Sequence, residues 1–245
     1  MRKKNNKRRD AIRMCVRYEM LPLRDEAFYQ DVVAYRLLLH SHSLRTSKAF
    51  RQLRVANSIA DTVIINGHGT VYEIKSDIDT FERLEGQLKD YFTVFSYVNV
   101  VIPEEKLVCL RTRLLSMPEF GRHVGIYVLT RRNALKKVTA PAEYNDDLNE
   151  TELLKMLRKP EYSKILRDEF GMLPDVPPAM FYSACRDLFL TLPVSKAQAL
   201  VMDAIKRRKA WSREDLEQFP EPQRIDLYFS YDNVQQVIRK EGLPV

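Results

Sequence analysis

The sequence predicts an α/β protein with a mixed sheet, followed by a region built from helices alone. A hairpin pattern covers residues 62–75, where two β-rich runs flank Asn66-Gly67-His68-Gly69. Helical patterns then alternate with short apolar runs at 97–102 and 125–129, which are typical of buried strands. This alternation predicts helices packed on a partly parallel sheet, and beyond about residue 140 only helical patterns follow.

The segments before the hairpin are mainly helical in pattern. Residues 10–20 and 25–40 predict helices, and in the second the apolar side chains recur at helical spacing. Glu26 suits the first turn of that helix, where a carboxylate complements the helix dipole. The pattern over 47–56 leaves helix and strand open.

A helix is predicted over residues 80–95, directly after the hairpin. Asp79 followed by Glu82 three residues later matches a capping box, so the helix is expected to begin there. A further helix is predicted over 104–117, between the two buried strands.

Three regions follow from these patterns. Residues 1–20 form a basic N-terminal arm, 21–140 the α/β core and 141–245 a helical C-terminal domain. Prolines and Asn145-Asp146-Asp147 mark the second boundary. The C-terminal helices are expected at 150–158, 161–169, 178–191, 195–209 and 212–218.

The charge of the chain is uneven. The formal net charge is +7, and residues 1–17 alone hold eight Lys or Arg, among them Arg8 and Arg9, against a single acid. Such an arm attracts polyanions, nucleic acid above all, although a solvated terminus explains it equally well. There is no secretory signal and no apolar run long enough to span a membrane, and the three cysteines lack ligand spacing, so we expect a cytoplasmic protein.

Three charged residues of the hairpin are candidates for chemistry. Glu73 and Lys75 are two apart on a predicted strand, so they share one face. Asp61 starts the partner strand and lies opposite them, and it shares their face if the loop length is odd or a bulge intervenes. Two carboxylates and an amine then suit a divalent cation, Mg²⁺ or Mn²⁺, acting on a phosphate group. The alternative is a surface ion pair of little consequence.

The next predicted helix adds a polar stripe. Arg83, Gln87 and Tyr91 recur at intervals of four, so they lie along one side of that helix. The stripe is expected to overhang the same cleft, and its alternative is an ordinary solvated face.

These motifs together resemble the PD-(D/E)XK nuclease superfamily. The order Asp61, Glu73-Ile74-Lys75, Gln87 and Tyr91 looks most like its RecB-type and lambda-exonuclease-type branch with a Q-x-x-x-Y motif. It is also similar to a group of uncharacterised bacterial nucleases with a helical C-terminal region. The resemblance implies a restriction-endonuclease-like core (αβββαβ, a mixed central sheet with flanking helices) and metal-dependent hydrolysis of DNA.

The resemblance also implies roles for individual residues. Asp61, Glu73 and the backbone carbonyl of Ile74 are expected to hold the metal, with Lys75 as catalytic lysine. The family expects an acid from the first core helix, for which Glu26 is the choice ahead of Asp31 and Glu19. Residues 50–55 contain no Asp or Glu, and if the family's additional acid belongs there, its absence argues against binding of a second metal ion. Gln87 and Tyr91 are expected to support the site or contact the nucleic acid. Arg83, from the same polar stripe, is a further candidate nucleic-acid contact.

Two further basic groups are candidate nucleic-acid contacts. Lys206, Arg207 and Arg208 end a predicted helix, where cations also complement the helix dipole. Arg131, Arg132, Lys136 and Lys137 follow the last predicted core strand.

The leading hypothesis is a deoxyribonuclease, in a defence or mobile-element setting. Its rival is a catalytically weak module of the same fold that binds nucleic acid or a protein partner through the helical region. The sequence leaves homodimerisation open.

Overall fold

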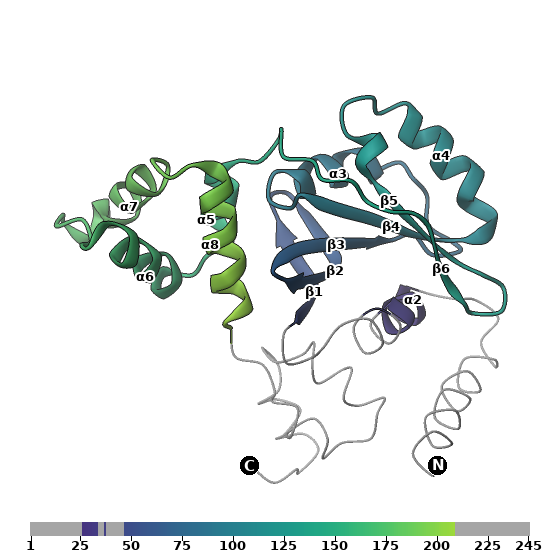
Figure 1. The fold of residues 1–245 in the computed structure, drawn as a ribbon, viewed down its shortest axis with the longest axis horizontal. Coiled ribbons are helices and arrows are strands. Elements are labelled where there is room, and N and C mark those ends of the chain that lie inside the picture. The colour runs from purple at the N-terminus through teal and green to yellow at the C-terminus, as the bar shows by residue number, and fades with distance from the viewer. Residues whose placement is uncertain (1–25, 34–36, 38–46, 209–245) are drawn as a thin grey trace, which may run out of the picture.

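A computed structural model of the chain describes residues 26–33, 37 and 47–208, and a six-stranded sheet lies at its centre (Figure 1). The strands follow one another across the sheet in chain order. β1, β2 and β3 are antiparallel, β3, β4 and β5 are parallel, and β6 returns antiparallel. The prediction of an α/β protein with a mixed sheet is therefore confirmed. The strands are β1 (Lys48–Val55), β2 (Ser58–Asn66), β3 (His68–Ile74), β4 (Tyr97–Pro103), β5 (Gly125–Leu129) and β6 (Leu135–Thr139).

Helices cover both faces of this sheet because its central strands are apolar on both sides. Along β4, Val100 and Ile102 belong to the cluster of buried side chains that includes α3 and α4, whereas Val101 belongs to the cluster with α2. The alternation follows from the two-residue period of a strand. The helices are α2 (Glu26–Val33), α3 (Leu84–Phe92) and α4 (Leu107–Leu115), the last preceded by the 3₁₀ turn η2 (Glu104–Lys106).

The hairpin of β2 and β3 turns on one glycine. Asn66 pairs with His68, so Gly67 alone lies between the paired residues, and its φ of 80° is the left-handed conformation that glycine adopts readily. From there the ladder runs to the pair Thr62 and Tyr72. The predicted hairpin is confirmed, and its odd loop fixes which residues share a face.

Three elements differ from the sequence prediction. The ambiguous segment 47–56 is strand β1, paired along the length of β2. Helix α3 begins only at Leu84, and the predicted capping box is wrong, because the Asp79 carboxylate instead accepts hydrogen bonds from the backbone N–H and the hydroxyl of Ser76. Strand β6 was not predicted, since three of its five side chains are exposed and no apolar run marks it.

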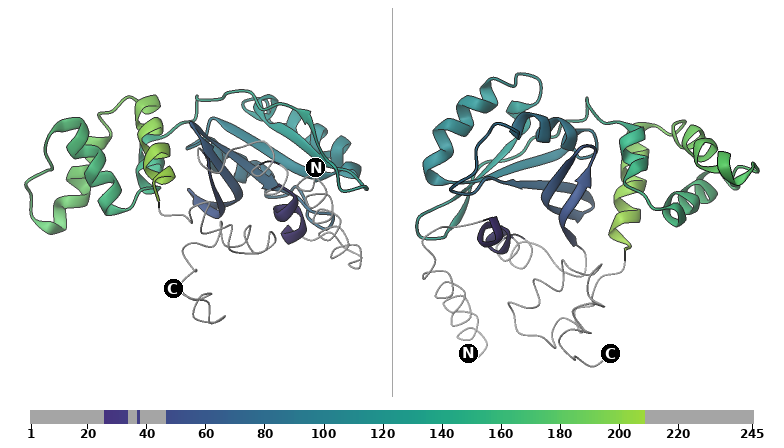
Figure 2. Two further views of the ribbon diagram at one scale, coloured as in Figure 1. Left: turned by 60° about the horizontal axis from the view of Figure 1, so that its bottom comes forward. Right: turned by 180° about the vertical axis from the view of Figure 1, so that it is seen from behind.

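The C-terminal helices lie to one side of the sheet (Figure 2). Helix α8 is the nearest and packs at the start of β3, where a Cβ on Gly69 would come within 2.7 Å of the Met202 sulfur. One cluster of buried side chains continues from the sheet through these helices. The predicted helices at 10–20 and 212–218 lie outside the described residues. The C-terminal helices are α5 (Glu150–Lys155), α6 (Lys159–Phe170), α7 (Phe181–Phe189) and α8 (Val194–Lys206).

Within the described part of the chain, no helix combines the length and apolar character needed to cross a membrane.

Candidate functional site

The register of the hairpin brings Asp61 and Glu73 together. The last ladder pair is Thr62 and Tyr72, so Asp61 and Glu73 are the next residues on the two strands and share a face. The Asp61 carboxylate accepts a hydrogen bond of 2.7 Å from the backbone N–H of Ile74, in the place of a further ladder bond. The predicted convergence is therefore present, while the chemical roles of these residues stay predictions.

Glu73 is the centre of a closed polar network. Its Oε1 accepts hydrogen bonds from Lys75 Nζ at 2.7 Å and from Gln87 Nε2 at 2.6 Å. Lys75 Nζ also donates to Gln87 Oε1 at 2.7 Å, which closes a ring of three side chains. Glu73 is 1% exposed and Lys75 is 5% exposed, so this ion pair is held away from bulk water. A buried pair of this kind keeps both charges only while its hydrogen bonds are complete.

The Tyr91 hydroxyl of helix α3 contacts the second carboxylate oxygen of Glu73. It lies 2.6 Å from Glu73 Oε2 and 2.9 Å from the carbonyl oxygen of Ile59, and its single hydrogen serves one of these acceptors at a time. The pKa of Tyr91 is raised by burial and by the negative charge of Glu73. The hydroxyl therefore remains a hydrogen-bond donor at all ordinary pH values.

Helix α3 carries Gln87 and Tyr91, and the helical repeat of about 3.6 residues places both side chains on the same side. Gln87 and Tyr91 are four residues apart and lie on one side of the helix, beside the buried Leu84 and Leu88. Arg83 is the N-cap residue of α3 and is exposed, and within the described residues no hydrogen bond or ion pair joins its side chain to the network. The structure thus brings Gln87 and Tyr91 to the predicted site but not Arg83.

Glu26 reaches the same site through a residue that the sequence did not suggest. The side-chain amide of Gln52 donates to Glu26 Oε1 at 3.1 Å and to Asp61 Oδ1 at 3.3 Å. Both neighbours are acceptors, which fixes the amide orientation chemically. Gln30, one turn along α2, donates to the same oxygen of Glu26 at 2.7 Å. Glu26, the first-helix acid chosen from the resemblance, is therefore joined to Asp61 through the Gln52 amide.

The backbone of Gln52 is unusual for a strand. Its φ is 53°, a left-handed conformation that costs a non-glycine residue of order 1–3 kcal/mol. Arg51 and Leu53 on either side keep their ladder partners, so Gln52 alone departs from the strand directly opposite Asp61. A propensity pattern cannot reveal such a residue, because only the register identifies its neighbour.

Ala56 provides a matched control for Gln52, since its φ of 50° is also left-handed and it lies in the β1–β2 turn. We expect Ala56→Gly to raise the free energy of unfolding by about 1 kcal/mol through relief of the backbone. Gln52→Gly relieves the same strain but loses the amide between two carboxylates, so its gain is expected to be smaller. Chemical denaturation at pH 8 measures both, and equal gains would show that the amide contributes nothing.

Asp61 lies in an environment that disfavours its charge. Burial, and then the nearby Glu73 carboxylate, raise the pKa of Asp61 to about 8, against the lowering effects of the Ile74 N–H and of Lys75. Glu26 adds further repulsion. Without a cation the Asp61 carboxyl therefore keeps its proton until the pH approaches 8, whereas a cation bound beside it would favour the charged form.

The donor set fits a hard divalent cation. Asp61 and Glu73 offer carboxylate oxygens on one face of the sheet, and Ile74, the residue after Glu73, offers a backbone carbonyl. Mg²⁺ prefers oxygen ligands of these kinds. In the described ranges no three His, Cys, Asp or Glu side chains already stand in a metal-ligand arrangement. Binding through Glu73 would thus exchange contacts that Lys75 and Gln87 now make.

The other predicted nucleic-acid contacts lie elsewhere. Arg8 and Arg9 fall outside the described residues. Lys206 and Arg207 end helix α8, where Arg207 pairs with Asp203. Arg208 donates from Nε and Nη2 to the Glu161 carboxylate, at 2.8 and 2.9 Å, and so ties the end of α8 to α6. Nucleic-acid binding by these three cations stays a prediction.

Fold and site together define an α/β protein with a buried carboxylate–lysine network on one face of a mixed sheet. A family model described as bacteriophage P4 protein cII matches residues 21–225, which is most of the chain. The protein belongs to the bacteriophage P4 protein cII family. No curated protein and no solved structure matches the chain.

Proposed function

We propose that this protein is a metal-dependent nuclease of the PD-(D/E)XK type that hydrolyses DNA. The observation that carries the proposal is the shared environment of Glu73: Lys75, Gln87 and Tyr91 all bind its carboxylate, and Asp61 lies opposite on the same face. A surface ion pair would need none of this burial. The network uses the same residues that the motif resemblance selected from the sequence.

The order of elements supports the same proposal. Helix α2, strands β1 to β3, helix α3 and strand β4 follow one another as αβββαβ, which is the order expected of a restriction-endonuclease-like core. We extend the proposal to that core and to a helical C-terminal domain. Membership of a family named after a bacteriophage protein is consistent with a mobile-element setting.

In the proposed reaction, water gives up a proton and forms a bond to phosphorus, while the bond from phosphorus to the leaving sugar oxygen breaks and that oxygen takes a proton. A divalent cation bound by Asp61 and Glu73 would supply positive charge for the phosphate and make the attacking water more acidic. Lys75 would neutralise the charge that develops on the phosphate oxygens. Gln87 would hold the Lys75 ammonium in place, as it does in the structure.

The test is cleavage of plasmid and linear DNA in Mg²⁺ or Mn²⁺ by the full chain. Lys75→Ala should lower the rate by at least about 100-fold, because an electrostatic group aimed at a transition state contributes on that order. Lys89→Ala is the matched control, since Lys89 is an exposed lysine of α3 that pairs with Glu85 and lies outside the network. Cutting that survives Lys75→Ala, or no cutting by the wild type, would reject the proposal.

A second candidate function rests on the closure of the network. Both oxygens of Glu73 already have hydrogen-bond donors on the protein. This arrangement favours a module that keeps the nuclease fold and binds DNA or a protein partner without cutting. DNA binding by the wild type, without cleavage in either metal, would support this function over the nuclease.

A further inference from the structure

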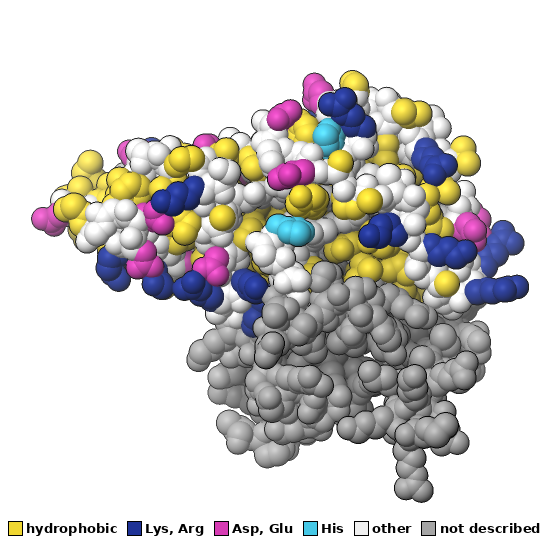
Figure 3. Space-filling view, viewed as in Figure 1, with side chains coloured by type: hydrophobic (Ala, Val, Ile, Leu, Met, Phe, Trp, Pro, Cys, Tyr) yellow, Lys and Arg dark blue, Asp and Glu magenta, His cyan; other side chains and the backbone are white. Residues whose placement is uncertain are grey.

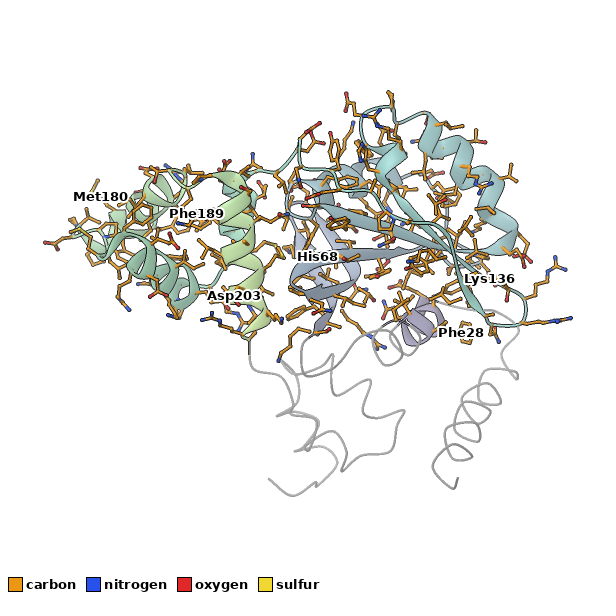
Figure 4. All side chains as sticks on the ribbon, viewed as in Figure 1. Phe28, His68, Lys136, Met180, Phe189 and Asp203 are labelled. Carbon is orange, nitrogen blue, oxygen red and sulfur yellow. The ribbon has the colours of Figure 1, made fainter. Side chains whose placement is uncertain are left out.

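Four cations project from the hairpin that joins β5 to β6. Arg131 and Arg132 lie in its turn, and Lys136 and Lys137 lie on β6. All four side chains are exposed, and we call these four residues the basic hairpin. Figure 4 places Lys136 at the end of the sheet opposite His68 and the C-terminal helices. Figure 3 shows further Lys and Arg side chains on the same side of the molecule.

The turn of the basic hairpin is held by its own hydrogen bonds. Thr130 N–H donates to the Ala134 carbonyl oxygen at 3.0 Å, and Asn133 N–H donates to the Thr130 carbonyl oxygen at 2.9 Å. Ala134 N–H also donates to the Thr130 hydroxyl at 3.1 Å. The cations are therefore presented from a defined backbone, which lowers the entropy cost of binding a ligand.

Two of the four cations contact other side chains of the protein. Arg131 Nε donates to Glu105 at 2.6 Å, and Lys137 Nζ lies 6.0 Å from the centre of the Tyr127 ring. Arg132 and Lys136 form no ion pair with any described residue. At least two positive charges of the hairpin are thus left without a protein counter-charge in the described ranges.

The sheet register relates the basic hairpin to the candidate site. Lys75 follows the pair Ile74 and Val101, and its backbone N–H continues the parallel ladder to β4. The same transverse row then passes through Ile102 and Val128 to Lys136. Lys136 is therefore three strand spacings from Lys75, roughly 14 Å at about 4.8 Å each, and it starts from the same face.

We propose that the basic hairpin binds the phosphate backbone of duplex DNA beside the phosphate at the candidate site. The inference rests on the proposed function, because it takes Lys75 as the position of the reacting phosphate. A separation of roughly 14 Å equals about four base pairs of B-DNA along the axis. The hairpin would thus hold the substrate on one side of the cut without reading its sequence.

Lysines on an edge strand also have a second explanation, since they prevent edge-to-edge association. That role concerns Lys136 and Lys137 on β6, but it does not account for Arg132 in the turn. It predicts aggregation when the charges are removed, whereas phosphate binding predicts weaker and less salt-sensitive DNA binding. Measurements of aggregation and of the salt dependence of DNA binding therefore distinguish the two explanations.

The test compares two triple variants of the full chain that remove the same net charge. The first is Arg132→Gln, Lys136→Gln and Lys137→Gln. The control replaces three surface cations of helices α5, α6 and α7 by glutamine: Lys155, Lys164 and Arg186, each paired with an acid nearby. Binding to a fluorescent duplex is measured by anisotropy in Ca²⁺ over a series of salt concentrations, and cleavage by the wild type is measured in Mg²⁺ in parallel.

We expect the hairpin triple variant to bind DNA at least about 10-fold more weakly than the wild type. The slope of log K against log salt concentration should become shallower by about two to three units, because each lost phosphate contact removes roughly 0.9 units of slope. The control variant should keep a slope close to the wild type. Equal losses in both variants, or an unchanged slope in the hairpin variant, would overturn the inference. If the wild type cleaves DNA and the hairpin variant keeps the wild-type salt slope, only this inference is rejected. If the hairpin variant loses slope and the wild type does not cleave DNA, only the proposed nuclease activity is rejected.

Discussion

Glu73→Gln is expected to lower the rate of DNA cleavage by at least about 100-fold and to destabilise the fold at the same time. The substitution removes the charge that a cation and Lys75 both need. It leaves the Lys75 ammonium, which is 5% exposed, without its carboxylate partner at 2.7 Å. Removing one partner of a buried ion pair costs about 3–5 kcal/mol, because the remaining charge has lost both water and its counter-ion.

A double variant separates the two effects. Glu73→Gln with Lys75→Met removes both charges and keeps the volume of the side chains nearly unchanged. Replacement of a complete buried pair is often neutral or stabilising, so the double variant should regain most of the lost stability and remain inactive. The free energies of unfolding of the wild type, both single variants and the double variant form a cycle that measures the coupling. Recovery of cleavage in the double variant, or the absence of any coupling, would contradict this account of the network.

The β2–β3 hairpin was predictable from the sequence because it depends on local chemistry. The face that Asp61 shares with Glu73 depended on the loop length, which the sequence left open and the register decides. A glycine after Asn66 sets the turn, and the period of two residues then decides which side chains share a face. Gln87 and Tyr91 were found for a similar reason, since their spacing of four residues is independent of where α3 begins. The error of several residues at the start of α3 therefore left the site unaffected.

Features that depend on contacts distant in sequence were not predictable. Gln52 matters because Asp61 lies across the ladder and Glu26 lies on another element, and neither fact is visible near residue 52. Strand β6 carries two adjacent lysines and a bulge in its pairing with β5, so neither a continuous apolar run nor a clean alternation marks it. Its position at the edge of the sheet explains why such a polar segment is stable as a strand.

Asp61→Asn is expected to stabilise the protein at pH 8 in the absence of metal. Burial and Glu73 raise the pKa of Asp61 from 3.8 to about 8, so the folded protein holds this proton over a range in which the unfolded chain has released it. The stability that the protonated carboxyl contributes is complete below about pH 4 and is lost as the pH rises to about 8. At 1.36 kcal/mol for each pKa unit, the loss approaches about 5 kcal/mol. Asparagine does not titrate, and its side-chain oxygen can still accept the Ile74 N–H.

Denaturation of wild type and Asp61→Asn at several pH values, each with and without Mg²⁺, measures this effect. The two proteins should be about equally stable near pH 4, and the variant should become the more stable one as the pH approaches 8. Mg²⁺ at pH 8 should reverse the order, because the cation stabilises only the protein that offers it the Asp61 carboxylate. Asp90→Asn is a suitable control, since Asp90 is a half-buried acid of α3 that binds Ser58. A wild type that is as stable as Asp61→Asn at pH 8 without metal, and that gains nothing from Mg²⁺, would show that the site has no excess negative charge for a cation to neutralise.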